Sequence, residues 1–178
     1  MTLGIPSWAA LLLAVMIGQR FGELYLTAQH LPYIRAHGGR EYGRAHFPFV
    51  VGVHTLFFIA FACELRHWHT HPGSLWPLWL GLFLAAQVLR YSAIRALGQR
   101  WSTRVFVLPG EPLVKSGPYR WLRHPNYVAV VVEFIAAPML FGAWRTAVLI
   151  GVLNAAVLTV RIRCENDALQ RAAVDSSR

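Results

Sequence analysis

Residues 127–160 have the sequence YVAVVVEFIAAPMLFGAWRTAVLIGVLNAAVLTV, and this stretch decides the fold. Two apolar runs, Tyr127 to Phe141 and Trp144 to Val160, are separated only by Gly142 and Ala143. At about 1.5 Å per residue, each run would form a helix about 23–27 Å long. The pattern predicts a tight helical hairpin in a membrane, with arms short enough to be tilted or partly re-entrant.

Three further apolar segments precede this hairpin, at residues 3–31, 47–63 and 75–97. The chain is 56% apolar and only 14% charged, whereas soluble domains carry about 25% charged residues. The sequence therefore predicts an all-α integral membrane protein of one domain with about five transmembrane helices. Residues 1–97 would form the first three helices. Residues 98–178 would form a structured cytoplasmic loop, the hairpin and a tail, which together make the functional core.

Basic residues indicate how these helices cross the membrane. Successive connections lie on alternate sides of the membrane. The connections and helix ends on one side carry 14 Lys or Arg residues, and those on the other side carry 2, while Arg20 lies inside the first segment. This asymmetry predicts an external N-terminus, with the long third connection and the C-terminus in the cytoplasm. The net charge of +9 does not indicate a nucleic-acid partner, because the arginines flank apolar segments and form no basic face.

The most informative polar stretch is GPYRWLRHPNY, residues 117–127. Gly117-Pro118 predicts a turn, and Pro125 suits the first turn of the fourth helix, which places His124 at its N-cap. A helix N-terminus offers free N–H groups and partial positive charge. With the neighbouring basic and aromatic side chains, this stretch could bind a carboxylate and an adenine ring. The same composition is also typical of an ordinary loop at the inner membrane surface.

Polar residues at helical spacing mark the hairpin itself. Asn154, Arg161 and Glu165 are seven and four residues apart, so they share one face of the fifth helix. Arg161 and Glu165 could pair directly, and the stripe could line a cavity or form a structural ion pair. Asn126 and Glu133 likewise share a face of the fourth helix. The intramembrane Glu133 indicates either a functional group or a contact between helices.

Two other polar groups favour structural interpretations. Arg20 and Glu23 are three residues apart in the first segment, which favours a mutual ion pair. His67, His69 and His71 lie close to Cys63 and Glu64 in the second connection. Clustered histidines can bind zinc or copper, but a surface loop is the favoured interpretation, and no metal site is predicted.

Several of these residues together resemble the isoprenylcysteine carboxyl methyltransferase family, within a wider group of membrane methyltransferases that includes phospholipid N-methyltransferases. The resemblance covers about residues 95–170. It is carried by Gly117-Pro118-Tyr119, Arg123-His124-Pro125-Asn126-Tyr127, and Arg161-Ile162-Arg163-Cys164-Glu165-Asn166 with Leu169. Family members often have two consecutive glutamates where this chain has Glu165-Asn166.

The resemblance implies S-adenosylmethionine as a methyl donor bound at the cytoplasmic side. It implies a catalytic role for Arg161 and Glu165 at the junction of donor and acceptor. Glu165 would be a general base or would hold the donor's hydroxyl groups, and Arg161 would orient Glu165 or stabilise an acceptor oxygen. Glu133 and Asn154 would contact the acceptor. The cofactor-binding residues implied are Tyr119, Arg123, His124, Pro125, Asn126, Tyr127 and Glu165.

The Glu-Asn pair and the sequence Trp101-Ser102-Thr103-Arg104-Val105 resemble a bacterial subgroup encoded beside type III polyketide synthases. This implies a bacterial inner-membrane enzyme that O-methylates a phenolic or pyrone lipid. Its partners would be that lipophilic small molecule and membrane lipids, whereas the oligomeric state stays open.

Other functions remain alternatives at this point. Carboxyl methylation of isoprenylcysteine-like substrates and phospholipid N-methylation belong to the same enzyme class. A nicotinamide-dependent membrane reductase shares a similar C-terminal hairpin. A non-enzymatic scaffold or transporter is disfavoured, because transporters commonly carry paired repeats and no second copy of the polar hairpin is present.

Overall fold

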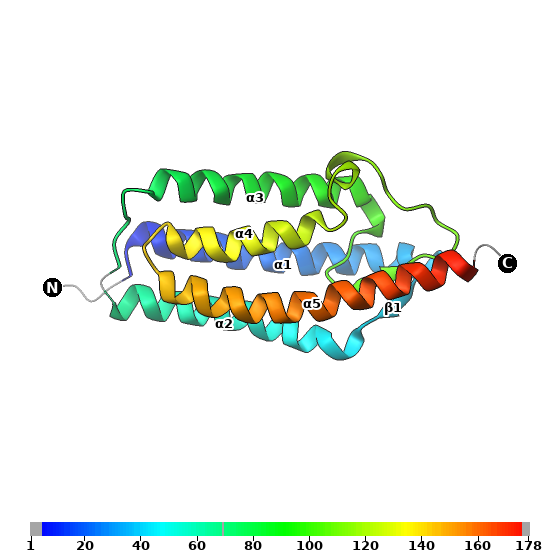
Figure 1. Ribbon diagram of the computed structural model, residues 1–178, viewed down its shortest axis with the longest axis horizontal. Coiled ribbons are helices and arrows are strands. Elements are labelled where there is room, and N and C mark those ends of the chain that lie inside the picture. Colours follow the sequence, from blue (N-terminus) through cyan, green and yellow to red (C-terminus); the bar gives the residue numbers. More distant parts are fainter. Residues whose placement is uncertain (1–4, 69, 176–178) are drawn as a thin grey trace.

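Five α-helices lie along the long axis of the molecule (Figure 1). The computed structural model describes residues 5–68 and 70–175. The helices are α1 (Ser7–Ala36), α2 (Phe47–His67), α3 (Trp76–Leu97), α4 (Pro125–Met139) and α5 (Trp144–Asp175). The predicted all-α membrane fold with a C-terminal hairpin is confirmed.

Four of the helices are long and apolar enough to cross a membrane, at Ser7–Ala36, Arg44–His67, Trp76–Arg100 and Trp144–Ala172. Their outer faces expose large apolar side chains, including Phe21, Phe49, Val88 and Val152. Such faces suit lipid rather than water. The protein is therefore an integral membrane protein.

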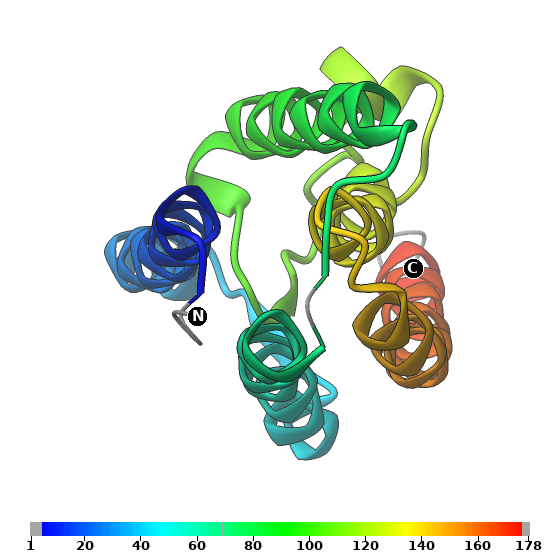
Figure 2. The same ribbon diagram turned by 90° about the vertical axis from the view of Figure 1, so that its left-hand side faces the viewer.

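Helix α4 is the exception, because its 15 residues span only about 22 Å of a hydrocarbon core about 30 Å thick. It lies between α3 and α5 (Figures 1 and 2), and eight of its residues are buried. Neighbouring helices thus cover most of α4, while Val128 and Val131 remain exposed on its outer face, which is why a short helix is tolerated between α3 and α5.

The connections between helices gather at two ends (Figure 1). The α2–α3 connection and the α4–α5 turn lie at one end. The α1–α2 connection, the 98–124 loop and the end of α5 lie at the other end, which carries most of the basic residues. We propose that this second end faces the cytoplasm, because an excess of Lys and Arg marks the cytoplasmic side.

A small antiparallel ribbon was not predicted. Strand β1 (Arg40–Tyr42) pairs with β2 (Val105–Val107), so that Tyr42 lies opposite Val105. Arg104 donates to Glu41 across the ribbon at 3.1 Å. Short 3-10 turns occur in the same two connections: η1 (Arg44–His46), η2 (Gly98–Arg100) and η3 (Gly117–Arg120). The ribbon joins the α1–α2 connection to the loop that follows α3.

The hairpin turn has a specific geometric requirement at Gly142. Its φ is +75°, a region that favours glycine, and a Cβ there would lie 2.5 Å from the carbonyl oxygen of His71. The N–H of Ala143 closes the turn by donating to Pro138 at 2.9 Å. The predicted exit from α4 at Gly142 and Ala143 is confirmed.

A carboxylate from α2 caps the N-terminus of α5. Glu64, 2% exposed, accepts hydrogen bonds from the backbone N–H of Arg145 at 3.1 Å and of Thr146 at 2.6 Å. An acceptor with negative charge at a helix N-terminus satisfies free N–H groups and complements the helix dipole. Glu64 therefore fixes the hairpin to α2.

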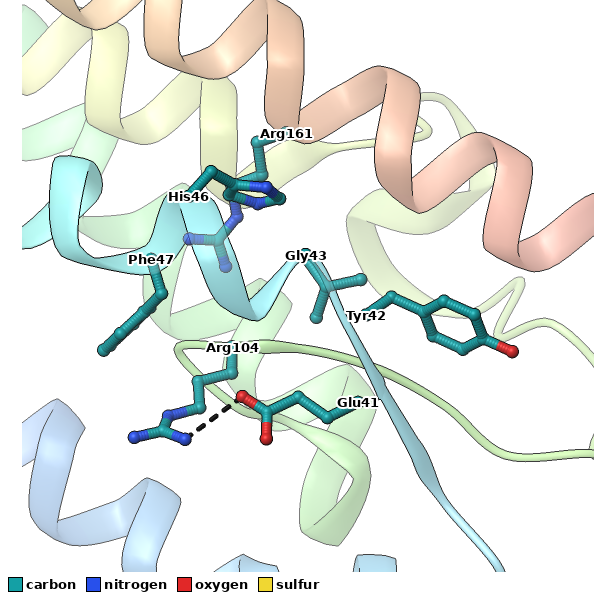
Figure 3. Close-up of a pocket in the computed structure, with 8 residues that line it drawn as sticks. Glu41, Tyr42, Gly43, His46, Phe47, Arg104 and Arg161 are labelled. Carbon is teal, nitrogen blue, oxygen red and sulfur yellow. Dashed lines mark hydrogen bonds and ion pairs between the residues drawn. The ribbon is translucent and has the colours of Figure 1, made fainter.

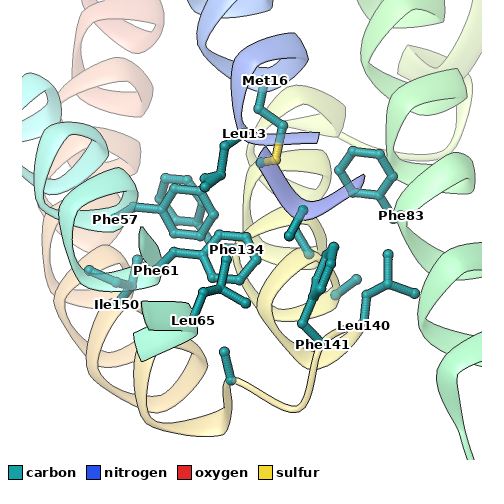
Figure 4. Packing of buried hydrophobic residues seen from close by; sticks show 14 of the residues in the cluster. Leu13, Met16, Phe57, Phe61, Leu65, Phe83, Phe134, Leu140, Phe141 and Ile150 are labelled. Carbon is teal, nitrogen blue, oxygen red and sulfur yellow. The ribbon is translucent and has the colours of Figure 1, made fainter. Parts of the chain in front are cut away.

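The apolar core lies in the half of the bundle near this hairpin turn (Figure 4). Phe57 and Phe134 stack with ring centroids 4.6 Å apart, and Phe61 meets Phe141 edge to face at 5.7 Å. Met16, Phe83 and Ile150 bring α1, α3 and α5 to the same cluster. Aromatic pairs of this kind add to the packing that holds α4 among its neighbours.

A buried ion network connects α1, α3 and α4 farther along the bundle. Glu133, with 0% exposure, accepts from Arg20 at 2.7 and 2.8 Å and from Arg90. Arg20 also binds Glu23 at 2.8 Å, which confirms the predicted pair, and Arg90 lies 3.3 Å from Glu23. Arg90 is 1% exposed. The 14 basic residues counted at connections and helix ends included Arg90, which instead lies inside the bundle.

Helix α5 continues as a single helix to Asp175, well beyond the apolar run that ends near Val160, which confirms that Arg161 and Glu165 lie on the fifth helix. The residues of α5 become polar where the helix leaves the lipid, but the backbone keeps its helical hydrogen bonds beyond the membrane. The extension carries Arg161, Glu165 and Asn166 on the same rigid element as the transmembrane arm.

We predict that Arg90→Leu destabilises the protein by about 3–5 kcal/mol, because it leaves two buried carboxylates, Glu23 and Glu133, to share the single arginine Arg20. The double variant Arg90→Leu/Glu133→Leu removes both charges and should recover most of that loss. Unfolding of the detergent-purified variants, followed by intrinsic fluorescence, measures both effects.

Arg66→Leu is the matched control, because Arg66 is exposed and such surface substitutions cost within about 0.5 kcal/mol. A double variant less stable than the Arg90→Leu single variant would contradict the ion-network interpretation.

Candidate functional site

The predicted turn and helix start are confirmed at residues 117–127. Gly117 has a φ of +56° and begins the 3-10 turn η3, and α4 begins at Pro125 with His124 as its N-cap residue. Pro125 is buried, while Arg123 is exposed. This arrangement brings the His124 and Tyr127 side chains to the face of α4 that meets α5.

The Tyr127 hydroxyl is the centre of the site. It donates a hydrogen bond to the Glu165 carboxylate and accepts one from Arg161 Nε at 2.9 Å. The Arg161 guanidinium also lies 5.3 Å from the centroid of the Tyr127 ring. Direct pairing of Arg161 with Glu165 was predicted, but the described residues show no such ion pair. The two charged side chains instead meet through the phenol of Tyr127.

Arg161 is anchored on its other side by residues outside the predicted site. Its Nη2 donates to the carbonyl oxygen of Thr103 at 2.5 Å. The N–H of Thr103 donates in turn to the hydroxyl of Thr27 on α1 at 3.0 Å. Arg161 is 7% exposed, so these bonds matter for its orientation. Nothing in the spacing of the sequence indicated Thr27 or Thr103.

His124 connects α4 to the cytoplasmic extension of α5. Its Nδ1 lies 3.6 Å from Glu165 Oε2, and its Nε2 lies 3.3 Å from the side-chain oxygen of Asn166. The imidazole stacks on the Tyr127 ring with centroids 5.2 Å apart and planes 16° apart. Asn166, at the position where the resembling family often has glutamate, is thus part of the same cluster.

Tyr119 and Asn126 complete the predicted set. Tyr119 is half-buried in η3. Burial raises the pKa of its phenol above the ordinary value, and the negative charge of Glu165 raises that pKa further. The side-chain oxygen of Asn126 is buried without a hydrogen-bond partner among the described residues. An acceptor left unpaired in this way is costly unless something else satisfies it.

Two residues predicted to contact the acceptor lie elsewhere. Glu133 belongs to the ion network with Arg20 and Arg90. Asn154 is 4% exposed and lies seven residues before Arg161, about 10 Å away along the α5 axis. The structure does not bring either residue to the Tyr127 cluster.

A pocket lies on the side of Arg161 that faces the ribbon (Figure 3). It is a shallow hollow: its lining side chains leave no internal space for a water molecule, and the surrounding empty space of about 170 Å³ includes open solvent. It is lined by Glu41, Tyr42, Gly43, His46, Phe47, Arg104, Val105 and Arg161. Arg161 therefore borders both the cluster around Tyr127 and this pocket.

The histidines at the opposite end do not form part of this site. His67 ends α2, and His71 follows in the α2–α3 connection. His69 lies outside the described residues. Among the residues that the structure describes, no three His, Cys, Asp or Glu side chains are grouped as a metal site would require.

Comparison with known proteins adds a family and two relatives. The model of the "Isoprenylcysteine carboxyl methyltransferase (ICMT) family" matches residues 79–171, more than half of the chain. An uncharacterized protein of Bacillus subtilis, YpbQ, is 38% identical over 92% of this chain and 98% of its own length. An uncharacterized protein of Haemophilus influenzae is 24% identical over 88% of this chain and 91% of its own length.

We predict that the Tyr119 phenol stays protonated near pH 10, where an ordinary tyrosine is about half ionised. Burial and the Glu165 charge both disfavour its phenolate. An ultraviolet difference titration of the wild type against Tyr119→Phe should therefore show no tyrosinate signal near that pH. A clear step there would contradict the burial of the phenol.

Proposed function

We infer that this protein, which belongs to the isoprenylcysteine carboxyl methyltransferase family, transfers a methyl group from S-adenosylmethionine to a lipophilic acceptor. Family membership and four candidate membrane spans support a membrane methyltransferase. The finer proposal is O-methylation of a lipid with a phenol or pyrone ring. The observation that carries it is the Tyr127 hydroxyl, which joins Arg161 and Glu165 beside His124.

The residues around Tyr127 fit the chemistry of the proposed donor. A sulfonium cation is attracted to a carboxylate and to aromatic faces, and Glu165 lies here beside the rings of Tyr127 and His124. The α4 N-terminus and exposed Arg123 can bind the donor's carboxylate. The unpaired oxygen of Asn126 can accept from an amine. These residues would hold the donor, together with Tyr119.

The donor supplies a methyl group that is already activated, so the main task of the chain is to orient the reactants. Glu165 accepts a hydrogen bond from the Tyr127 hydroxyl and lies beside His124. These contacts favour a donor-holding role for Glu165 over a role as general base. Arg161, fixed by Tyr127 and Thr103, is placed to stabilise negative charge that develops on an acceptor oxygen.

The membrane setting explains how a lipophilic acceptor would arrive. Each methylene of an alkyl chain favours the lipid phase by about 0.8 kcal/mol, so such an acceptor concentrates among the helices. The proposed site lies at the basic end of the bundle. A water-soluble donor can reach it there from the cytoplasm, while the acceptor comes from the bilayer.

The first test is binding of S-adenosylmethionine and S-adenosylhomocysteine to detergent-purified protein by isothermal titration calorimetry. We predict that His124→Ala and Glu165→Gln each weaken binding about tenfold or more, because each removes a polar contact worth about 1.5–3 kcal/mol near a charged group. Transfer of labelled methyl from the donor to an extractable alkylphenol would then test the reaction.

His37→Ala is the matched control, because His37 is exposed and its ring bonds only to the Tyr33 carbonyl. It should bind the donor as the wild type does. Well-folded wild type that binds NADPH but neither sulfur compound would refute the proposal and favour the reductase alternative.

A further inference from the structure

The pocket between Arg161 and the β-ribbon has a chemistry of its own (Figure 3). Arg161 uses Nε for Tyr127 and Nη2 for Thr103. Within the described residues its Nη1 makes no hydrogen bond. One donor of this guanidinium therefore remains available to a ligand in the pocket that Arg161 lines.

His46 lies directly beside the Arg161 guanidinium in this pocket (Figure 3). The turn at Gly43, with a φ of +64°, lets the imidazole fold back over the chain. A Cβ at Gly43 would lie 1.9 Å from a carbon of the His46 ring, so only glycine leaves room for this placement. The ring makes no hydrogen bond to another described residue. The local sequence thus positions an unengaged imidazole next to an available guanidinium.

Glu165 is poorly placed to serve the same pocket. Its carboxylate binds the Tyr127 hydroxyl and lies beside His124, and Glu165 is not among the pocket-lining residues. The titratable and charged groups that face His46 come from three elements. They are Arg161 on α5, Arg104 next to β2, and Glu41 and Tyr42 on β1. The carboxylate among them, Glu41, is paired with Arg104.

We propose that this pocket is the acceptor subsite, that it takes a hydroxyl-bearing aromatic or enolic ring, and that His46 is the base that removes the hydroxyl proton. This deepens the proposed function and rests on it. Arg161 Nη1 would bind the acceptor oxygen. A phenol has a pKa of about 10, so it needs such a base near neutral pH, whereas an acceptor that is already ionised does not.

The proposed step balances in atoms and charge. The acceptor oxygen loses its proton to a ring nitrogen of His46 and forms a bond to the methyl carbon of the sulfonium donor. The carbon–sulfur bond breaks, and its electron pair stays on sulfur, which becomes a neutral thioether. The imidazolium of His46 then releases the proton to water through the open mouth of the pocket.

Binding a ring requires the Arg104–Glu41 pair to move, because side chains fill most of the pocket. The two side chains are 38% and 22% exposed, and an exposed ion pair of this kind contributes little to stability. The Arg104 guanidinium also lies over the Phe47 ring, 4.8 Å from its centroid, so a bound ring would take the place of Arg104 there. Phe47 supplies an aromatic wall, and exposed Val51 lies one turn farther along the same face of α2, where an alkyl chain of the acceptor would meet lipid.

The test compares two alkylphenols that carry the same chain, one ordinary and one made acidic by a nitro group so that it is ionised at the assay pH. His46→Gln should lose about 10²–10⁴-fold in kcat with the ordinary phenol and much less with the acidic one. Its affinity for S-adenosylhomocysteine should stay within about twofold of the wild type. Gly43→Ala, which displaces the imidazole without removing it, should show the same selective loss. His37→Gln, an exposed histidine, should match the wild type.

Each contrary result has a distinct meaning. Equal losses with the two phenols would overturn the role of His46 as a base, and unchanged rates would overturn the subsite. Wild-type protein that binds the donor but methylates neither phenol would overturn the acceptor class. Failure of the wild type to bind the donor would refute the proposed function itself.

Discussion

The Glu133 carboxylate is the constraint on which the arrangement of the helices depends. It is wholly buried in α4, and a bilayer offers no water to stabilise an unpaired charge. Arg20 and Arg90 supply that stabilisation, and they tie α1 and α3 to α4. Apolar contacts alone would hold α1 less specifically, because lipid tails are as apolar as the leucines of a helix. The ion network therefore fixes both the register and the rotation of α1.

That rotation has a consequence for the candidate site. Arg20, Glu23, Thr27 and His30 follow one another at spacings of three, four and three residues, so they lie on one face of α1. With the first two held in the ion network, Thr27 meets Thr103, and His30 meets the carbonyl of Trp101 at 2.8 Å. Thr103 then holds Arg161. The N-terminal half of the chain, outside the matched residues 79–171, thus contributes to the orientation of a central residue of the site.

The sequence predicted those features that depend on neighbours in the chain. The turn at Gly117, the α4 start at Pro125 and the Arg20–Glu23 pair were correct, because each involves residues at most a few positions apart. The partners of Glu133 are 113 and 43 residues away, and no periodicity carries that information. The same reason explains why the ribbon of residues 40–42 and 105–107 was missed. Spacing on α5 suggested a direct Arg161–Glu165 pair, but spacing could not reveal that the Tyr127 hydroxyl from α4 lies between them.

The position of Arg161 also indicates where the donor and the acceptor of a methyl transfer would bind relative to each other. Its guanidinium faces Tyr127 and, through that hydroxyl, Glu165 on one side, and it faces His46 on the other. Loss of Arg161 would therefore disturb both regions, and its effect could not be assigned to either. His124 and His46 each belong to one region, because His124 contacts Glu165 and Asn166 while His46 lines the ribbon pocket. A reaction that joins a water-soluble donor to a membrane-soluble acceptor needs such a division. Each reactant must enter from its own phase, and the methyl carbon of the donor must still contact the acceptor oxygen. Because Arg161 borders both regions, that contact would form beside its guanidinium.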